Sequence, residues 1–314
     1  MDNRGLIQKY KVNYPLTQDE IYRHLPQNKR CGVKPWYQLS VIRMNSTYLE
    51  CIDKFFWHKG VFTSIGGIPF LVFVGGFISV LIIMALRYSG SSPSEQQKTI
   101  LVSIAYIAML VFVVCFFGSA LKKEAFNYTH YPLRFNRRNR MVYVFRTDGT
   151  VLAKPWDEFY FTLSNLGEDT WEVRGLILND KRDTVLEVCP LSIHDSFKSR
   201  NFLKQWEFIR RYMEEPDELP KLADQIEYVM DVADRRESFG KGMKCLELEL
   251  GSLAILALPL TLFNAIGRMF AMLMSKIPQW PNEVEVQCQI DPNDPYLRDQ
   301  DHLAPPIDYE DVED

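Results

Sequence analysis

The sequence predicts a membrane protein of mixed α+β class. We expect a two-helix transmembrane hairpin, a small antiparallel sheet closed by one amphipathic helix, and further helices after it. Three features of the 314-residue chain support this prediction. Two long uncharged runs cover residues 61–86 and 99–121, short alternating segments begin at Pro132, and an apolar stripe with helical spacing follows in residues 201–213.

The two apolar runs predict membrane-spanning helices. Residues 61–86 and 99–121 contain no Asp, Glu, Lys, Arg or His. Both runs exceed the roughly 20 residues that an α-helix needs to cross about 30 Å of hydrocarbon, because each residue rises about 1.5 Å. A core helix of a soluble protein normally has a polar face, and neither run has one. We therefore expect a hairpin over residues 61–121 with a connector at residues 87–98.

The distribution of basic residues predicts the orientation of this hairpin. Residues 1–60 contain ten Lys and Arg residues and residues 122–140 contain six, whereas the connector has only Arg87 and Lys98. Basic segments are retained on the cytoplasmic side, so the connector is expected to face outward. The expected divisions are an N-terminal region 1–60, the hairpin 61–121, a sheet-plus-helix domain 122–215, a helical region 216–277 and an acidic, proline-rich tail 278–314.

The residues after the hairpin alternate as strands do. Five or six short antiparallel strands are expected from Pro132 onward, and Asp148-Gly149 predicts a hairpin turn between two of them. A helix follows, in which four apolar residues share one face: Phe202, Trp206, Ile209 and Met213. A small sheet closed by one helix resembles the pleckstrin-homology-like modules that bacterial membrane proteins carry.

A third apolar segment, residues 252–274, is ambiguous in hydropathy. Its ten Leu, Ile and Phe residues are offset by Arg268, Asn264 and Pro259, so the insertion free energy is near zero. A helix near residues 259–277 would place Asn264 and Arg268 on a narrow polar stripe. Three alternatives stay open. The helix lies in the membrane interface, packs on the cytoplasmic domain or a partner, or spans the bilayer as a third helix.

A basic cluster and an acidic tail provide the candidate contact residues. The motif "RFNRRNR" is favoured as an orientation signal in a solvated turn, and binding of anionic lipid headgroups is the alternative interpretation. The candidate contact residues are Arg134, Arg137, Arg138, Arg140, Asn264 and Arg268. The tail, with eleven acidic residues in 277–314, is expected to be disordered or extended. A solubilising end is the favoured interpretation of it, and the alternatives are binding to a basic partner surface or to the protein's own basic cluster.

The sequence contains no recognisable catalytic or metal-binding motif. Its five histidines lack the H-E-x-x-H spacing, no G-x-S-x-G occurs, and its six cysteines form no C-x-x-C pair. We expect no catalytic residue, no cofactor and no metal, and hence not an enzyme. The net charge of −4 and the membrane spans argue against nucleic acid as a partner.

Three later segments carry a resemblance to a family. "YPLRFNRRNRMVYVFRTDGTVLAKPWDEFYF", "WEFIRRYMEE" and "IPQWPNEV", after a two-helix hairpin, resemble an uncharacterised family of Gram-negative inner-membrane proteins encoded near type VI secretion effectors. The resemblance covers about residues 30–290. It implies a multi-pass protein of the bacterial inner membrane, with the N-terminus and main domain in the cytoplasm.

The same resemblance implies a function and its partners. An immunity protein would neutralise a cognate, membrane-acting toxin by direct binding. The expected partners are that toxin or a secretion-system protein, together with the lipid bilayer, and a homo-oligomer stays open. The alternative is a membrane-tethered adaptor or scaffold for a secretion or envelope complex, acting through its cytoplasmic domain and acidic tail.

Overall fold

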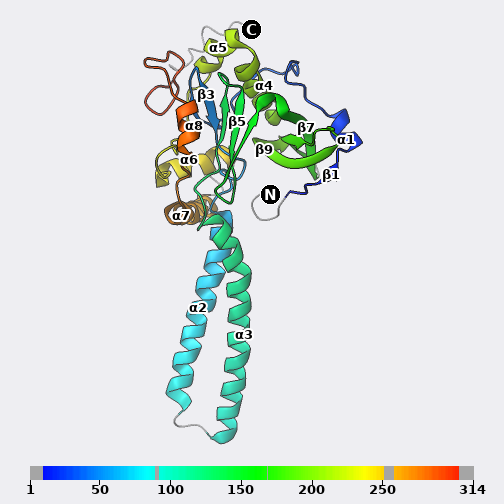
Figure 1. The fold of residues 1–314 in the computed structure, drawn as a ribbon. Helices are drawn as coiled ribbons and strands as arrows, with labels where there is room; N and C mark the ends of the chain where they lie inside the picture. Colours follow the sequence, from blue (N-terminus) through cyan, green and yellow to red (C-terminus); the bar gives the residue numbers. More distant parts are fainter. Residues whose placement is uncertain (1–9, 89–91, 168, 251–257, 304–314) are drawn as a thin grey trace. The chain divides into compact units, whose positions relative to one another are not determined.

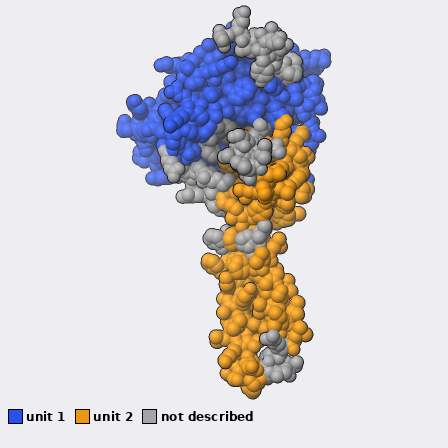
Figure 2. All heavy atoms as spheres, turned by 180° about the vertical axis from the view of Figure 1, so that it is seen from behind, with its two compact units in different colours: residues 1–56, 128–236, 277–314 blue, residues 57–127, 237–276 orange. Residues whose placement is uncertain are grey.

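The computed structural model describes residues 10–88, 92–167, 169–250 and 258–303. The chain divides into two compact units, coloured separately in Figure 2. Unit 1 consists of residues 1–56, 128–236 and 277–314, and unit 2 consists of residues 57–127 and 237–276. Each unit is therefore assembled from segments that are far apart in the sequence.

Unit 1 contains a five-stranded antiparallel sheet (Figure 1). Its strands, in spatial order, are β2 (Val41–Met44), β3 (Tyr48–Cys51), β4 (Leu133–Asn136), β5 (Met141–Phe145) and β6 (Val151–Pro155). The predicted turn between β5 and β6 is present, and Gly149 adopts a φ of +86° there. The sequence placed residues 1–60 in a separate region, but the structure differs. Strand β3, which precedes the hairpin in the chain, pairs with β4, which follows it, and Leu49 lies opposite Phe135. Residues before the hairpin therefore complete the sheet.

Unit 1 also contains a four-stranded antiparallel sheet. Its order is β1 (Tyr14–Pro15), β9 (Thr184–Ser196), β8 (Thr170–Leu178) and β7 (Phe159–Gly167). The 3-10 turn η1 (Trp156–Glu158) joins β6 to β7, and the short helix α1 (Gln18–Tyr22) lies between β1 and β2 in the chain. The predicted mixed α+β class with antiparallel pairing is confirmed, but the strands form two sheets rather than the one small sheet expected from the sequence.

Helix α4 (Asn201–Glu214) packs into the core of unit 1. The four residues of the predicted apolar stripe are all buried, and Trp206 stacks on Trp156 with a ring-centroid distance of 5.7 Å. Burial extends beyond the stripe, because Glu207 and Arg210 are also inaccessible to solvent. Because the helix is covered on several sides, close packing restricts the conformations of its ionic side chains as well as of its apolar ones.

The segments after α4 are less helical than the sequence predicted. The turn η2 (Pro216–Glu218) and helix α5 (Leu219–Asp224) are followed by residues 225–238, which contain no helix. The tail also differs from the expected disordered or extended state. Residues 277–303 carry α8 (Asn282–Gln287), and Val284 and Cys288 pack on Tyr48 and Tyr143 of the sheet. Aromatic and aliphatic residues within the acidic segment hold it in place.

Unit 2 contains the apolar hairpin, formed by α2 (Val61–Tyr88) and α3 (Pro93–Glu124), and two further helices, α6 (Phe239–Leu250) and α7 (Leu258–Met274). Both α2 and α3 are long and apolar enough to cross a membrane. They pack through small residues and aromatic rings: Phe77 stacks on Tyr106 at 6.2 Å, and Gly76 leaves room for the Tyr106 hydroxyl.

The connector of the hairpin is shorter than the twelve residues expected from the sequence. Helix α3 begins at Pro93, because Pro suits the first helical position and the Glu95 carboxylate accepts a hydrogen bond from the Ser92 N–H at 3.3 Å. At the other end, α3 continues to Glu124, beyond the expected limit at residue 121.

Candidate functional site

A polar junction joins the helices of unit 2 at one end of the hairpin. Glu124, the last residue of α3, is 4% exposed, and its carboxylate caps the start of α2. It accepts hydrogen bonds from the backbone N–H of Gly60 at 3.0 Å and of Thr63 at 2.6 Å, and from the Thr63 hydroxyl at 2.6 Å. The first N–H groups of a helix lack partners within the helix, and its dipole favours a negative charge there. Glu124 therefore ties the end of α3 to the beginning of α2.

Arg268 of α7 is the second centre of this junction. It is 1% exposed, and its Nε and Nη2 donate to the two carboxylate oxygens of Glu237 at 2.6 and 3.2 Å. Its Nη1 donates to the backbone oxygens of Trp57 at 3.1 Å and Lys59 at 3.3 Å. A bidentate guanidinium–carboxylate pair fixes both partners in orientation as well as in distance. Arg268 thus connects α7 to the segment that leads into α2.

Two glycines allow α2 and α7 to touch at this junction. A Cβ atom at Gly267 would lie 2.0 Å from the Ser64 Oγ, and one at Gly60 would lie 2.3 Å from the Arg268 Cα. Gly60 also has a φ of +94°, which side-chain-bearing residues rarely adopt. The backbones of the two segments are consequently in direct contact.

The predicted candidates on α7 fall on the side of the helix that contacts α2. Arg268 is buried in the junction and Asn264 is half-buried. Sequence reasoning missed Glu124 and Glu237, which bind the junction's backbone and its arginine. The available signal for Glu124 was its position as the first carboxylate after an uncharged run, where a helix end needs partners.

The structure places the four arginines of the basic cluster in unit 1, each in contact with that unit's own side chains. Arg134 is 3% exposed and binds Glu50 at 3.1 Å and Glu285 of α8 at 3.2 Å. Burial opposes the charged form of Arg134, but the carboxylate of Glu50 outweighs it and raises the pKa of the guanidinium. The others pair as follows: Arg138 with Asp291, Arg140 with Asp157 and Glu214, and Arg137 with the ring of Tyr212 at 5.4 Å.

The acidic tail supplies part of these partners. Glu285 and Asp291 belong to the predicted tail, and both bind arginines of the basic cluster. Of the alternatives that the sequence left open for this tail, binding to the protein's own basic cluster is the one present in residues 277–303. The arginines predicted to contact a partner or lipid are thereby engaged within unit 1.

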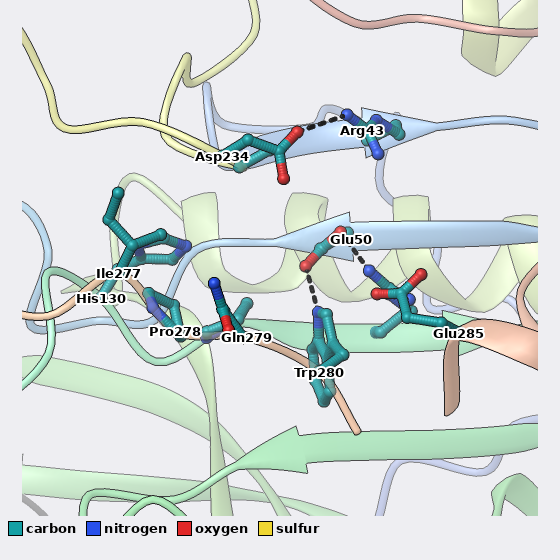
Figure 3. Close-up of a pocket in the computed structure, with 12 residues that line it drawn as sticks. Arg43, Glu50, His130, Asp234, Ile277, Pro278, Gln279, Trp280 and Glu285 are labelled. Atoms are coloured by element: carbon teal, nitrogen blue, oxygen red, sulfur yellow. Dashed lines mark hydrogen bonds and ion pairs between the residues drawn. The ribbon is translucent and has the colours of Figure 1, made fainter. Parts of the chain in front are cut away.

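A cavity of about 410 Å³ lies beside this arginine cluster in unit 1 (Figure 3). Glu50 projects from β3 into it, with the Trp280 indole Nε1 donating to its Oε1 at 2.7 Å. In the same wall, the Arg43 Nη2 lies 3.5 Å from a carboxylate oxygen of Asp234. The Nε atoms of Arg43 and Arg134 are buried and have no hydrogen-bond partner. The charged side chains of the wall pair with one another, Arg43 with Asp234 and Arg134 with both Glu50 and Glu285.

A second ionic cluster surrounds the buried carboxylate of Glu207. Burial favours its neutral form, but hydrogen bonds from Arg210 and Arg211 outweigh that effect and lower its pKa to about 2. Its neighbour Cys31 is a free thiol, and burial together with the Glu207 carboxylate raises the pKa of Cys31 to about 12. A thiol with so high a pKa is unreactive at neutral pH, so this cluster is a structural one.

Within the described ranges, no group of three or more His, Cys, Asp or Glu residues is arranged to hold a metal ion. The chain matches, over residues 107–292, a family described as a family of unknown function (DUF6708). No curated protein matches the chain, and no solved structure matches it.

Proposed function

The chain belongs to DUF6708, a family of unknown function, and we propose from its own residues that it is an integral membrane protein that acts by binding a partner at or within the bilayer. The observation that carries this proposal is the surface of the hairpin. Leu71 of α2 is 67% exposed and Leu101 of α3 is 73% exposed, as are many other apolar side chains along both helices. Exposed apolar surface on this scale is stable only in contact with lipid or another protein.

The lengths of the helices support a spanning hairpin. Helix α2 has 28 residues and α3 has 32, which correspond to roughly 42 and 48 Å at about 1.5 Å per residue, more than the hydrocarbon thickness of a bilayer. The basic residues at residues 1–60 and 122–140 support an orientation with unit 1 in the cytoplasm of a bacterium and the connector outside its inner membrane.

The specific function we propose is immunity. The protein neutralises a cognate, membrane-acting toxin of the type VI secretion class by binding it directly in the bilayer. The hairpin supports this, because a partner that acts within the membrane must be met by a surface inside the membrane. The resemblance to proteins encoded near type VI effectors supports the same proposal.

The alternative adaptor function would use the cytoplasmic domain and the acidic tail as binding surfaces. Glu285 and Asp291 of the tail pair with arginines of unit 1, which weighs against their use as a binding strap for another protein. The finer fold assignment, a pleckstrin-homology-like arrangement in unit 1, stays a proposal that is supported by the position of α4 directly after the last strand, β9.

The test is co-expression of the protein with toxins encoded beside its gene, with membrane potential as the measurement. We expect the intact chain to preserve the potential. A control variant replaces residues 70–112 with an unrelated two-helix hairpin of equal length, which leaves the junction at Gly60, Ser64 and Glu124 unchanged. This variant should still fractionate with membranes but lose protection.

Three outcomes would each contradict a part of the proposal. If no neighbouring toxin is neutralised while deletion of the gene stops secretion, the protein is an adaptor. If the hairpin replacement protects as well as the intact chain does, binding does not occur in the bilayer. Release of the protein from membranes by an alkaline wash would contradict membrane spanning itself.

A further inference from the structure

Helix α7 buries its polar face and exposes its apolar face, which is the opposite of an amphipathic helix on a protein in water. Its buried residues include Thr261, together with Gly267, which meets Ser64 of α2, and Arg268, which is bound in the junction. Its exposed residues are apolar, with between 40% and 58% of each exposed: Leu258, Leu260, Leu262, Ile266, Met269, Phe270, Leu273 and Met274. An amphipathic helix on a protein in water buries its apolar face instead. The exposed face of α7 therefore needs an apolar environment.

The contacts of α7 fix its direction within unit 2. Arg268 is bound at the start of α2, through the carbonyls of Trp57 and Lys59. Seven residues later, the Ser275 hydroxyl donates to the carbonyls of Glu124 and Ala125, at the end of α3. Seven residues span roughly 10 Å of helix, which matches the 8–10 Å between the axes of packed helices.

These two attachment points lie at the same end of the hairpin. Glu124 binds the Thr63 N–H, so the start of α2 and the end of α3 are at one level. A helix attached to both must run across the hairpin rather than along it. If α2 and α3 cross the bilayer, α7 lies in the plane of the membrane surface.

The apolar face of α7 is also continuous with the apolar surface of the hairpin. The ring of Phe270 packs edge-on against Phe126, just beyond the end of α3, at 6.4 Å. Ile65, in the first turns of α2, is 61% exposed, and Lys122 and Lys276 are exposed near the same ends. Basic residues beside an apolar face are typical of helices that lie in the headgroup region.

From this geometry we propose that α7 is an in-plane membrane helix, whose exposed face inserts into the acyl chains of the same leaflet that the hairpin enters at its junction end. This proposal rests on the proposed function in one respect, namely that α2 and α3 span the bilayer. Helix α7 itself is too short to span: its 17 residues cover roughly 25 Å, less than about 30 Å of hydrocarbon.

Spin labels in lipid vesicles test this proposal on the full chain. In a background with the six cysteines replaced by serine or alanine, single cysteines are introduced at Leu262, Ile266 and Leu273 of α7. A matched control carries the label at Lys244, an exposed residue of α6. Relaxation by oxygen, which partitions into lipid, is compared with relaxation by a nickel chelate, which stays in water.

The expected result is greater relaxation by oxygen than by nickel at all three α7 positions, at one common depth about 5–10 Å below the headgroup boundary. The label at Lys244 should be relaxed mainly by nickel. Far-ultraviolet circular dichroism checks that each labelled variant keeps its helix content.

Three results would overturn the proposal. Depth that increases steadily from Leu262 to Leu273 means a spanning helix, nickel access at all positions means a face in water, and access to neither reagent means contact with a second copy of the chain. Labels at Leu71 and Leu101 test the hairpin separately, in the same vesicles. If those labels lie deep in the bilayer while the α7 labels are in water, only this inference fails, whereas nickel access at Leu71 and Leu101 overturns the spanning hairpin.

Discussion

The contact between α2 and α7 predicts that Gly267 does not tolerate even one additional methyl group. In Gly267→Ala the new Cβ would lie 2.0 Å from the Ser64 Oγ and 2.9 Å from the Gly60 carbonyl oxygen. Attractive contacts between carbon atoms begin near ~3.5 Å. The Ser64 hydroxyl can rotate away, but the Gly60 backbone cannot, so α7 and α2 must separate by roughly 0.5–1 Å.

The cost follows from two opposing effects. Overpacking of a close contact costs about 1–3 kcal/mol, and we expect the upper part of this range because backbone atoms are involved. Alanine in a helix interior is favoured over glycine by about 1 kcal/mol. The net loss in the free energy of unfolding should be about 1–2 kcal/mol.

Gly240 provides the matched control. It lies in α6 of the same unit, and a Cβ atom there would meet nothing within 4 Å. Gly240→Ala should therefore stabilise the protein, by up to about 1 kcal/mol. Thermal unfolding in detergent micelles, followed by far-ultraviolet circular dichroism, compares the two variants. Adding Ser64→Ala to Gly267→Ala should recover part of the loss, because it removes the nearest atom. Equal stability of the two single variants would refute the close contact.

Three further predictions concern ionic groups. Glu237→Gln leaves the buried Arg268 without its charge partner and should lower the free energy of unfolding by about 3–5 kcal/mol. In a double-mutant cycle with Arg268→Met, the double variant should lose less unfolding free energy than the two single variants lose together. Glu207 has a folded-state pKa of about 2, below its ordinary value. Its ionisation therefore contributes about 3 kcal/mol to the free energy of unfolding above pH ~4.5, and this contribution is lost as the pH falls through ~2. Glu207→Gln should make the stability less dependent on pH at the acid end of a stability-against-pH curve. Trp280→Phe removes the hydrogen-bond donor to the buried Glu50 and should lower the midpoint of thermal unfolding by the equivalent of about 1.5–3 kcal/mol. An unchanged midpoint would show that this hydrogen bond does not stabilise the fold.

The parts of the fold that follow from local sequence pattern were predictable. Uncharged runs located the apolar helices, and the turn residues Asp148 and Gly149 located the hairpin between β5 and β6. The pairing of β3 with β4 was not predictable, because more than 80 residues of the chain separate Glu50 from its partner Arg134. Nothing local in a short alternating segment says which distant strand completes its sheet.

The site was predictable in its residue types but not in their pairing. The arginine cluster and the acidic tail are both visible in the sequence, yet only the structure shows that Arg134 binds Glu285 and that Arg138 binds Asp291. A charge cluster looks the same in sequence whether its partner is a lipid headgroup or another segment of the chain. The decisive quantity is burial, and Arg134 is 3% exposed.

The ambiguity of residues 252–274 in hydropathy has a structural cause that α7 makes clear. At the junction, α7 meets the ends of α2 and α3, whose unpaired backbone groups need hydrogen bonds rather than apolar contacts. Arg268 and Ser275 provide these bonds, so the polar stripe is the part of the helix that packs. The residues of α7 that stay exposed, among them Leu262, Ile266 and Leu273, are apolar. A helix that packs on a polar junction with one side and contacts an apolar medium with the other carries both polar and apolar residues, so its insertion free energy is near zero. The hydropathy sum therefore does not show which of the two sides is buried.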